Sequence, residues 1–256
     1  MSNSAISRHV RWSSLLLPAL LVGLVLGAYT LKVRPVAVGA SAQGAVTASS
    51  AEEFLARGIG EHNAGRYDAA LDLYHKVLQQ DPANAKAHYN IAQIHNAQGR
   101  YPQAQWEYEA ALKADSQFLD ARLNLGVVLY RQRKFGDAAQ EFRQVLQVSP
   151  KHPLALFDLG VALLESGEPE PAVQWLTAAL REDAKRPDTH YYLGVALERQ
   201  RKLPEARDAF QQAIALNPRN AAAYAALSKV YQAQGEQRLA SEALVKAVEL
   251  DPSLKK

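Results

Sequence analysis

From residue 51 onwards, apolar residues recur at intervals of three and four positions, the spacing that lines one face of an α-helix. Leu125 and Leu129 belong to one such stripe, and Phe142 and Leu146 belong to a second stripe after a short polar interval. Glycines and prolines stand between successive stripes, where they favour turns. The pattern predicts pairs of short amphipathic helices and therefore an all-α fold.

The predicted helix pairs recur with a period of 34 residues, and they divide residues 51–252 into six repeats. No single pair can bury its apolar stripes alone, so stacking of neighbouring pairs must supply the core. The expected repeats are 51–84, 85–118, 119–152, 153–186, 187–220 and 221–254. Three columns define the period: alanine at 70, 104, 138, 172, 206 and 240, then Tyr74, Tyr108, Phe142, Leu176, Phe210 and Leu244, and the small residues Gly58, Ala92, Gly126, Gly160, Gly194 and Ser228.

This spacing of leucine, small residue, alanine, aromatic residue and proline resembles the tetratricopeptide repeat. The resemblance covers residues 51–252, about four-fifths of the chain, without an insertion. It implies a right-handed superhelix, an α-solenoid, of six helix-turn-helix repeats. His88, Arg122 and His190 replace the aromatic residue of the opening column, and we expect them to weaken individual repeats.

The segment 12–31 precedes the repeats and contains no charged residue. Twenty helical residues span roughly 30 Å, the thickness of a bilayer core. The segment is therefore either an uncleaved transmembrane helix, with residues 1–11 in the cytoplasm, or the apolar core of a cleaved signal peptide. Lys32 and Arg34 follow the apolar run directly and favour the anchor.

Residues 32–50 are rich in Ala, Gly, Ser and Val, which is typical of a flexible linker. Small residues near Ala40 and Ala42 provide the cleavage sites that the signal-peptide alternative needs. Under either alternative we expect the repeats to lie outside the cytoplasm. They are then membrane-anchored with a periplasmic repeat domain, or secreted to the periplasm after cleavage.

Charge and composition exclude several classes of function. The whole chain carries +3 and its first fifty residues carry +4, so the remainder carries about −1. A nucleic-acid-binding domain needs positive charge clustered on its folded part, so we expect no nucleic acid partner. The chain contains no cysteine, no HExxH pair, no glycine-rich phosphate loop and no G-x-S-x-G motif. We therefore expect no catalytic residue, no metal site, no cofactor and no enzyme activity.

The family resemblance implies that the first helix of each repeat lines a concave groove that binds a protein or peptide. The predicted binding residues are Tyr89, Asn90, Gln93, Leu123, Asn124, Val127, Phe157, Asp158, Val161, Tyr191, Tyr192 and Val195. Asn90, Asn124 and Asp158 resemble a short asparagine ladder, although asparagine also occurs in this column for structural reasons. The apolar members either line the groove or pack against a neighbouring helix, and the sequence leaves both interpretations open.

The predicted function is that of a membrane-tethered scaffold, which binds a partner protein or peptide during assembly of an envelope complex. The alternative is a non-catalytic accessory subunit of a polysaccharide-export or cytochrome-maturation enzyme complex. Only Ser253–Lys256 follow the last repeat, too few residues for a covering helix. We therefore expect an exposed apolar face at the C-terminal repeat, through which the chain forms homo-oligomers.

Overall fold

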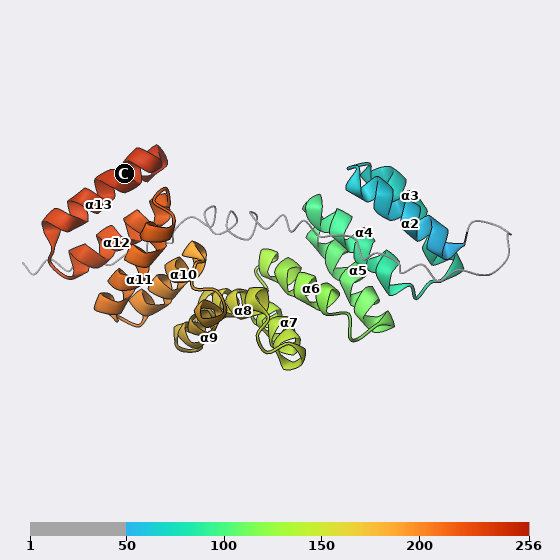
Figure 1. Ribbon diagram of the computed structural model, residues 1–256, viewed down its shortest axis with the longest axis horizontal. Coiled ribbons are helices and arrows are strands. Elements are labelled where there is room, and N and C mark those ends of the chain that lie inside the picture. The colour runs from blue at the N-terminus through green and yellow to red at the C-terminus, as the bar shows by residue number, and fades with distance from the viewer. Residues whose placement is uncertain (1–49, 256) are drawn as a thin grey trace, which may run out of the picture. The chain divides into compact units, whose positions relative to one another are not determined.

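The computed structural model describes residues 50–255, which form α-helices and one short 3-10 helix (Figure 1). The first helices of the pairs are α2 (Ala51–Asn63), α4 (Ala85–Ala97), α6 (Leu119–Arg131), α8 (Pro153–Ser166), α10 (Pro187–Arg199) and α12 (Ala221–Ala233). The second helices are α3 (Tyr67–Gln80), α5 (Tyr101–Ala114), α7 (Phe135–Val148), α9 (Pro169–Glu182), α11 (Leu203–Leu216) and α13 (Gln237–Leu250). A 3-10 helix, η1 (Pro252–Leu254), follows α13.

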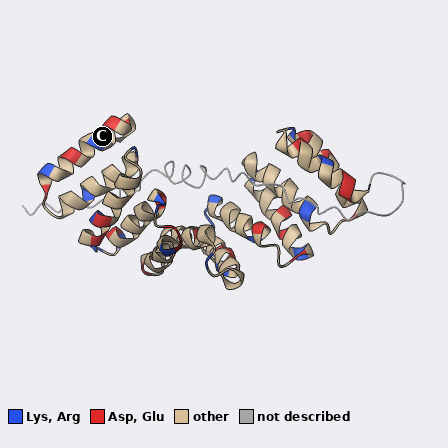
Figure 2. Cartoon of the chain, viewed as in Figure 1, with Lys and Arg blue, Asp and Glu red and all other residues tan. Residues whose placement is uncertain are grey.

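The predicted all-α solenoid is confirmed over this range. Each first helix packs against the second helix of its own pair, and each second helix packs against the first helix of the next pair. The pairs follow one another in chain order from the blue α2 to the red α13 (Figure 1). Both signs of charge are distributed over these helices (Figure 2).

No helix within residues 50–255 has the length and apolarity needed to cross a membrane. The predicted membrane segment 12–31 lies outside the described residues, as does the linker as far as residue 49.

Short polar side chains position the helix starts. The side chains of Ser50, Asn84, His152 and Asn220 each accept a hydrogen bond from the backbone N–H three residues later. Such N-caps satisfy donors that the first helical turn leaves unpaired. The turns that follow the second helices add a second recurring bond, in which a side-chain oxygen accepts from the N–H two residues later. It occurs at Asp81, Asp115, Asp183, Asn217 and Asp251.

The turns inside the repeats require a left-handed backbone at one position. Glycine supplies it at residues 65, 99, 167 and 235, with φ between 71° and 92°. Arg133 and Arg201 occupy the equivalent positions in the third and fifth repeats, each with φ of 62°. A side chain in this region costs about 1–2 kcal/mol, which the surrounding turn must offset.

The core depends on one contact between the paired helices. A small residue in the first helix faces a large residue sixteen positions later in the second helix. A methyl group added at Gly126 would stand 2.5 Å from the Phe142 ring, and one added at Gly194 would stand 2.6 Å from the Phe210 ring. The glycine therefore lets the two helices approach closely enough for the ring to fill the space between them.

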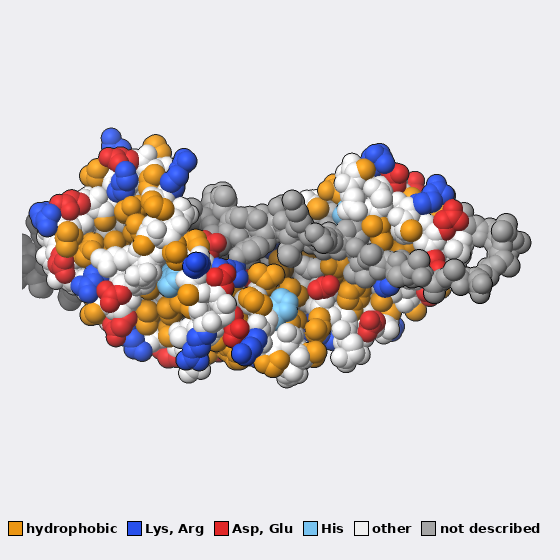
Figure 3. Space-filling model, in the orientation of Figure 1, with side chains coloured by type: hydrophobic (Ala, Val, Ile, Leu, Met, Phe, Trp, Pro, Cys, Tyr) orange, Lys and Arg blue, Asp and Glu red, His pale blue; other side chains and the backbone are white. Residues whose placement is uncertain are grey.

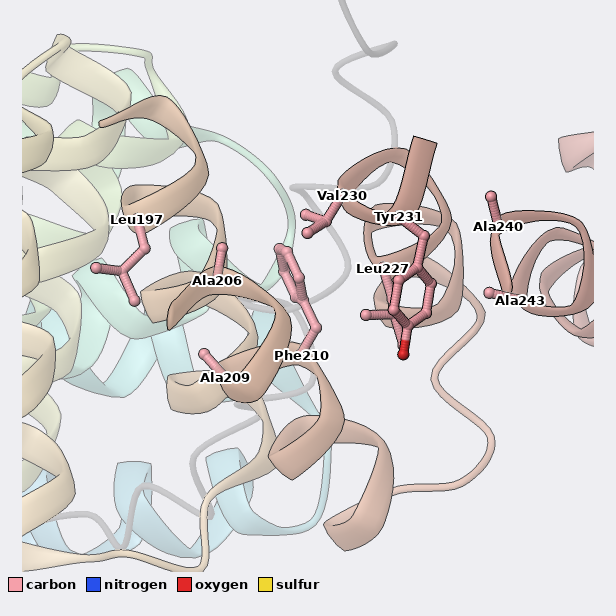
Figure 4. Packing of buried hydrophobic residues seen from close by; sticks show 9 residues of the cluster. All are labelled: Leu197, Ala206, Ala209, Phe210, Leu227, Val230, Tyr231, Ala240 and Ala243. Atoms are coloured by element: carbon pink, nitrogen blue, oxygen red, sulfur yellow. The ribbon is translucent and has the colours of Figure 1, made fainter. Parts of the chain in front are cut away.

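The same ring also contacts the next repeat. Phe210 of α11 lies between Ala206 of its own helix and Val230 of α12 (Figure 4). All six residues of the alanine column have exposed fractions of 1% or less. The large column is equally buried from Tyr74 to Phe210, but Leu244 in the last repeat is 41% exposed. A following repeat is thus needed to cover this side chain.

The three polar residues of the opening column stabilise the turns between repeats. Hydrogen bonds join His88 Nε2 to the Pro82 carbonyl over 3.1 Å and His190 Nε2 to the Ala184 carbonyl over 2.9 Å. Arg122 Nη2 donates to the Ser116 carbonyl over 3.0 Å, so all three contact the carbonyl six residues earlier. The expectation that these residues only weaken their repeats overlooked this bond.

Two of them also form an ion pair with the second helix. His88 Nδ1 lies 2.6 Å from Glu107 Oε2, and Arg122 Nη1 lies 2.9 Å from Glu141 Oε2. Hydrogen bonding to Glu107 raises the pKa of His88, while burial opposes this shift. Both nitrogens of His88 therefore have acceptors that favour the protonated ring, and the stabilisation is lost as the pH rises through the raised pKa.

Gly194→Ala tests the contact between the paired helices. The added methyl group must displace the Phe210 ring, which costs roughly 1–3 kcal/mol, while alanine returns about 1 kcal/mol of helix propensity. Thermal and urea unfolding should therefore show a net loss of about 0–2 kcal/mol, whereas a substitution without the clash should gain up to about 1 kcal/mol. Gly136→Ala in α7 is the matched control, because its added methyl group meets no atom within 4 Å. Equal stability of the two variants would contradict the account.

Candidate partner-binding surface

The twelve predicted binding residues lie on four first helices, α4, α6, α8 and α10, and are here called the first-helix surface. Val127, Tyr191 and Val195 are partly exposed, and the other nine are buried. Figure 3 shows one face of the molecule, on which apolar side chains are exposed between charged ones.

The aromatic members of this surface pack both within a repeat and between neighbouring repeats. Tyr89 of α4 packs on Phe118, which precedes α6, with ring centroids 4.7 Å apart. Phe157 of α8 meets Tyr192 of α10 edge-on at 5.7 Å. Tyr191 lies 5.9 Å from Phe210 of α11. These aromatic residues therefore have a packing role. That they bind a partner stays a prediction.

The asparagine column has unequal hydrogen bonding. Asn124 Nδ2 donates to the Tyr89 hydroxyl over 3.2 Å and so joins α6 to α4. Asn90 Nδ2 donates to the Lys86 carbonyl over 2.7 Å, but its Oδ1 is buried without a partner. Asparagine therefore has a structural role in this column. The side-chain oxygen of Asn90 remains without a hydrogen-bond donor.

Further unpaired polar atoms are concentrated on the first helices. Both amide atoms of Gln93 and Oδ1 of Asn96 are buried without a hydrogen bond of standard geometry, as is the Tyr130 hydroxyl. The Gln93 amide nevertheless lies close enough to the Tyr89 hydroxyl to oppose the rise in its pKa that burial causes. Buried polar groups are normally paired, and each exception costs about 1–3 kcal/mol. With Asn90, three side chains of α4 therefore present amide oxygens without a hydrogen-bond donor. Asn96 and Tyr130 were not among the predicted binding residues, although they follow the same period of 34.

Asp158 of α8 is a buried carboxyl group, with an exposed fraction of 6%. Burial raises its pKa to about 8. A folded-state pKa above the ordinary value means that the native state binds a proton more tightly than the unfolded chain does. The contribution of Asp158 to the free energy of unfolding therefore decreases as the pH rises from 3.8, the ordinary pKa of the group, towards 8. The asparagine-ladder hypothesis treated Asp158 as a hydrogen-bonding side chain, and its desolvation was not visible in the sequence.

A separate cavity of about 480 Å³ opens beside the starts of α2 and α4. Asp81, Asp115 and Glu52 are among its lining residues, together with Lys86. Asp81 and Asp115 already accept backbone N–H bonds in the turns between repeats. These two carboxylates therefore have a structural role. Among the residues that the structure describes, no group of three or more His, Asp or Glu side chains could hold a metal ion.

Family models described as tetratricopeptide repeat match this chain almost continuously from residue 62 to residue 254. The matched segments are 62–106, 97–146, 123–187, 187–220 and 221–254. No curated protein sequence matches the chain.

Several solved structures share the fold. MamA residues 41 to the end from Desulfovibrio magneticus RS-1 is 22% identical, with a TM-score of 0.63, and the match covers 68% of this chain and 98% of that one. PilF from Pseudomonas aeruginosa is 22% identical, with a TM-score of 0.65, over 79% of this chain and 92% of that one. YrrB, described as a TPR protein with an unusual peptide-binding site, is 22% identical, with a TM-score of 0.60, over 70% and 92%.

Proposed function

We propose that this chain, which belongs to the tetratricopeptide repeat family, is a membrane-tethered scaffold that binds an extended segment of a partner protein. The unpaired amide oxygens of Asn90, Gln93 and Asn96 on α4 are the observation that carries this proposal. A peptide backbone offers both N–H donors and C=O acceptors, and it can therefore satisfy Asn90, Gln93 and Asn96 together.

The spacing of the repeats supports an extended partner. Equivalent residues recur every 34 positions on neighbouring first helices, so α4, α6, α8 and α10 present one row of similar side chains. Asn90, Asn124 and Asp158 form such a row. A stacked array of this kind suits a partner that contacts several repeats in turn.

We further propose that residues 12–31 anchor the chain in a membrane and that the repeats lie outside the cytoplasm. The charge-free apolar run supports the anchor. Tethering raises the effective concentration of the scaffold near membrane partners. Assembly of an envelope complex is the role that follows from this arrangement. A non-catalytic accessory role in a polysaccharide-export or cytochrome-maturation complex uses the same binding surface and is the alternative.

The C-terminal repeat supports a second contact surface. Leu244 and Val245 of α13 are 41% and 58% exposed, and they lie next to each other on the last helix of the array. We therefore propose that α13 mediates self-association of the chain, as the sequence predicts.

Photo-crosslinking from intact membranes tests the binding surface. A photoreactive amino acid at Val127 of α6 should form adducts with a partner, because this residue is a partly exposed member of the first-helix surface. The same amino acid at Trp106 of α5, which is 62% exposed, is the control on a second helix. In the Val127 background, Gln93→Leu should lower the adduct yield roughly tenfold, since an amide that bonds the partner is lost.

Stability separates binding from folding in this experiment. Replacement of an unpaired buried amide by an apolar group of similar size should leave the melting temperature unchanged or raised. Gln234→Leu is the matched control, because Gln234 also has an unpaired buried amide oxygen but follows α12 in a turn. Adducts that form only from Trp106, or that persist in Gln93→Leu, would refute the proposed surface.

Membrane anchoring is tested by mapping the N-terminus of the mature protein and by carbonate extraction. An uncleaved anchor predicts a mature N-terminus upstream of Trp12 and a protein that stays with the membrane fraction. A mature N-terminus near Ser41 or Gln43, with release of the protein by carbonate, would instead establish a cleaved signal peptide.

A further inference from the structure

The outer face of α13 carries apolar side chains that earlier repeats bury. The large column is buried in each of the five earlier repeats, and Phe210 lies against Val230 of the next first helix in this way (Figure 4). Leu244 occupies the same column in α13, and 41% of it is exposed. Among the residues that the structure describes, α13 is the last α-helix, so no following first helix covers this side chain (Figure 1).

A second exposed residue of α13 is apolar where the repeat pattern is polar. Val245 follows Leu244 in the chain and is 58% exposed. The equivalent positions of the five earlier second helices are all polar, namely His75, Glu109, Arg143, Thr177 and Gln211. The last repeat therefore differs from the others in having an apolar residue at a position that faces solvent. Leu244 and Val245 together are here called the terminal apolar face, and exposed apolar patches of this kind mark contact surfaces.

The first helix of the array, α2, lacks the apolar residues with which other first helices cover a preceding repeat. In α4 these residues are buried in one cluster with side chains of α3, and they are Ala87, Ile91 and Ile94. The equivalent positions of α2 hold Glu53, Arg57 and Gly60, which are all exposed. Stacking of α2 of one copy on α13 of another would bury the charges of Glu53 and Arg57 against apolar side chains, which is costly. A head-to-tail contact between copies is therefore unfavourable.

The charges of α13 are complementary to those of a second, antiparallel α13. Arg238 forms an ion pair with Glu242. Lys246 Nζ lies 3.0 Å from Glu249 Oε2, so the signs alternate along the helix and cancel. Arg238 stands six residues before Leu244, and Glu249 stands five residues after it. Two antiparallel copies of α13 that meet near Leu244 therefore bring Arg238 of each copy near Glu249 of the other, whereas parallel copies would bring like charges together.

We propose that α13 forms a two-fold symmetric, antiparallel contact with α13 of a second copy, which makes the chain a dimer joined at its C-terminal repeats. This inference rests on the proposed self-association, and it names the surface that covers the terminal apolar face. A two-fold contact is closed, because each copy presents the same surface and no free end remains for further growth. The dimer then carries two first-helix surfaces and can bind a partner with two segments more tightly than a single copy does.

Disulfide trapping tests this contact, because the chain contains no cysteine of its own. One helix face is smaller than a standard interface of about 800 Å² per partner, so the dimer should be weak and a covalent bond is needed to trap it. Mild oxidation of full-length Val245→Cys in detergent micelles should give a disulfide-linked dimer, since a residue near a two-fold axis lies close to its own copy. Gln211→Cys, at the equivalent exposed position of α11, is the matched control and should give roughly tenfold less dimer.

Substitutions in the Val245→Cys background assign the dimer to the apolar and charged parts of α13. Leu244→Glu should lower the dimer yield roughly tenfold, because the symmetric contact loses the leucine of both copies and gains two like charges. Arg238→Glu and Glu249→Arg should each lower the yield about threefold, and the two changes in one chain should restore it, since opposite charges then meet again. All of these positions are exposed, so the melting temperature should be nearly unchanged.

Each contrary outcome overturns a defined part of the account. A disulfide that forms only when Val245→Cys and Arg57→Cys chains are mixed indicates head-to-tail stacking, which overturns the two-fold contact and leaves self-association standing. A dimer yield that survives Leu244→Glu, or that the double charge reversal does not restore, overturns the antiparallel contact. A monomer whose introduced thiol at position 245 resists alkylation shows that another segment of the same chain covers α13, and it overturns self-association as well. Partner binding is tested separately by the crosslink at Val127 and stands in every case.

Discussion

The close approach of a small residue and a large side chain within each helix pair is the contact on which the structure depends. Gly58, Gly126, Gly160 and Gly194 have no room for a methyl group, because the side chain opposite already fills that space. The same large side chain extends to the next repeat, as Phe210 does towards Val230. One contact therefore fixes the geometry of a pair and its stacking on the following pair, and it recurs every 34 residues.

This contact also determines which side chains reach the first-helix surface. One side of each first helix is held against the second helix of its pair. The remaining side chains of the first helix therefore face the neighbouring repeats or the first-helix surface. Phe157 connects two repeats through its contact with Tyr192, whereas Tyr191 packs on Phe210 within its own repeat. The residues that support the array thus include those that we propose to recognise a partner.

The fold could be predicted from the sequence because its columns repeat in phase. Ala70, Ala104 and the equivalent alanines are spaced by 34 residues, and their burial follows directly from that period. The hydrogen bonds of His88, Arg122 and His190 could not be predicted in this way. They depend on the distance from each side chain to the carbonyl six residues earlier, which only the folded turn defines.

The candidate surface could be predicted only in part. The period placed Asn90, Asn124 and Asp158 on successive first helices, as the structure has them. It did not distinguish Asn124, whose side chain bonds Tyr89, from Asn90, whose amide oxygen is unpaired. Nor did it reveal the desolvation of Asp158, which arises from helices that the chain brings together over more than one repeat.

The most direct test of the central claim is hydrogen–deuterium exchange of the full-length chain with and without its crosslinking partner. If the first-helix surface binds an extended segment, backbone protection should increase in α4, α6, α8 and α10, with smaller changes in α5, α7 and α9. Protection confined to the second helices, or to α13 alone, would contradict the account.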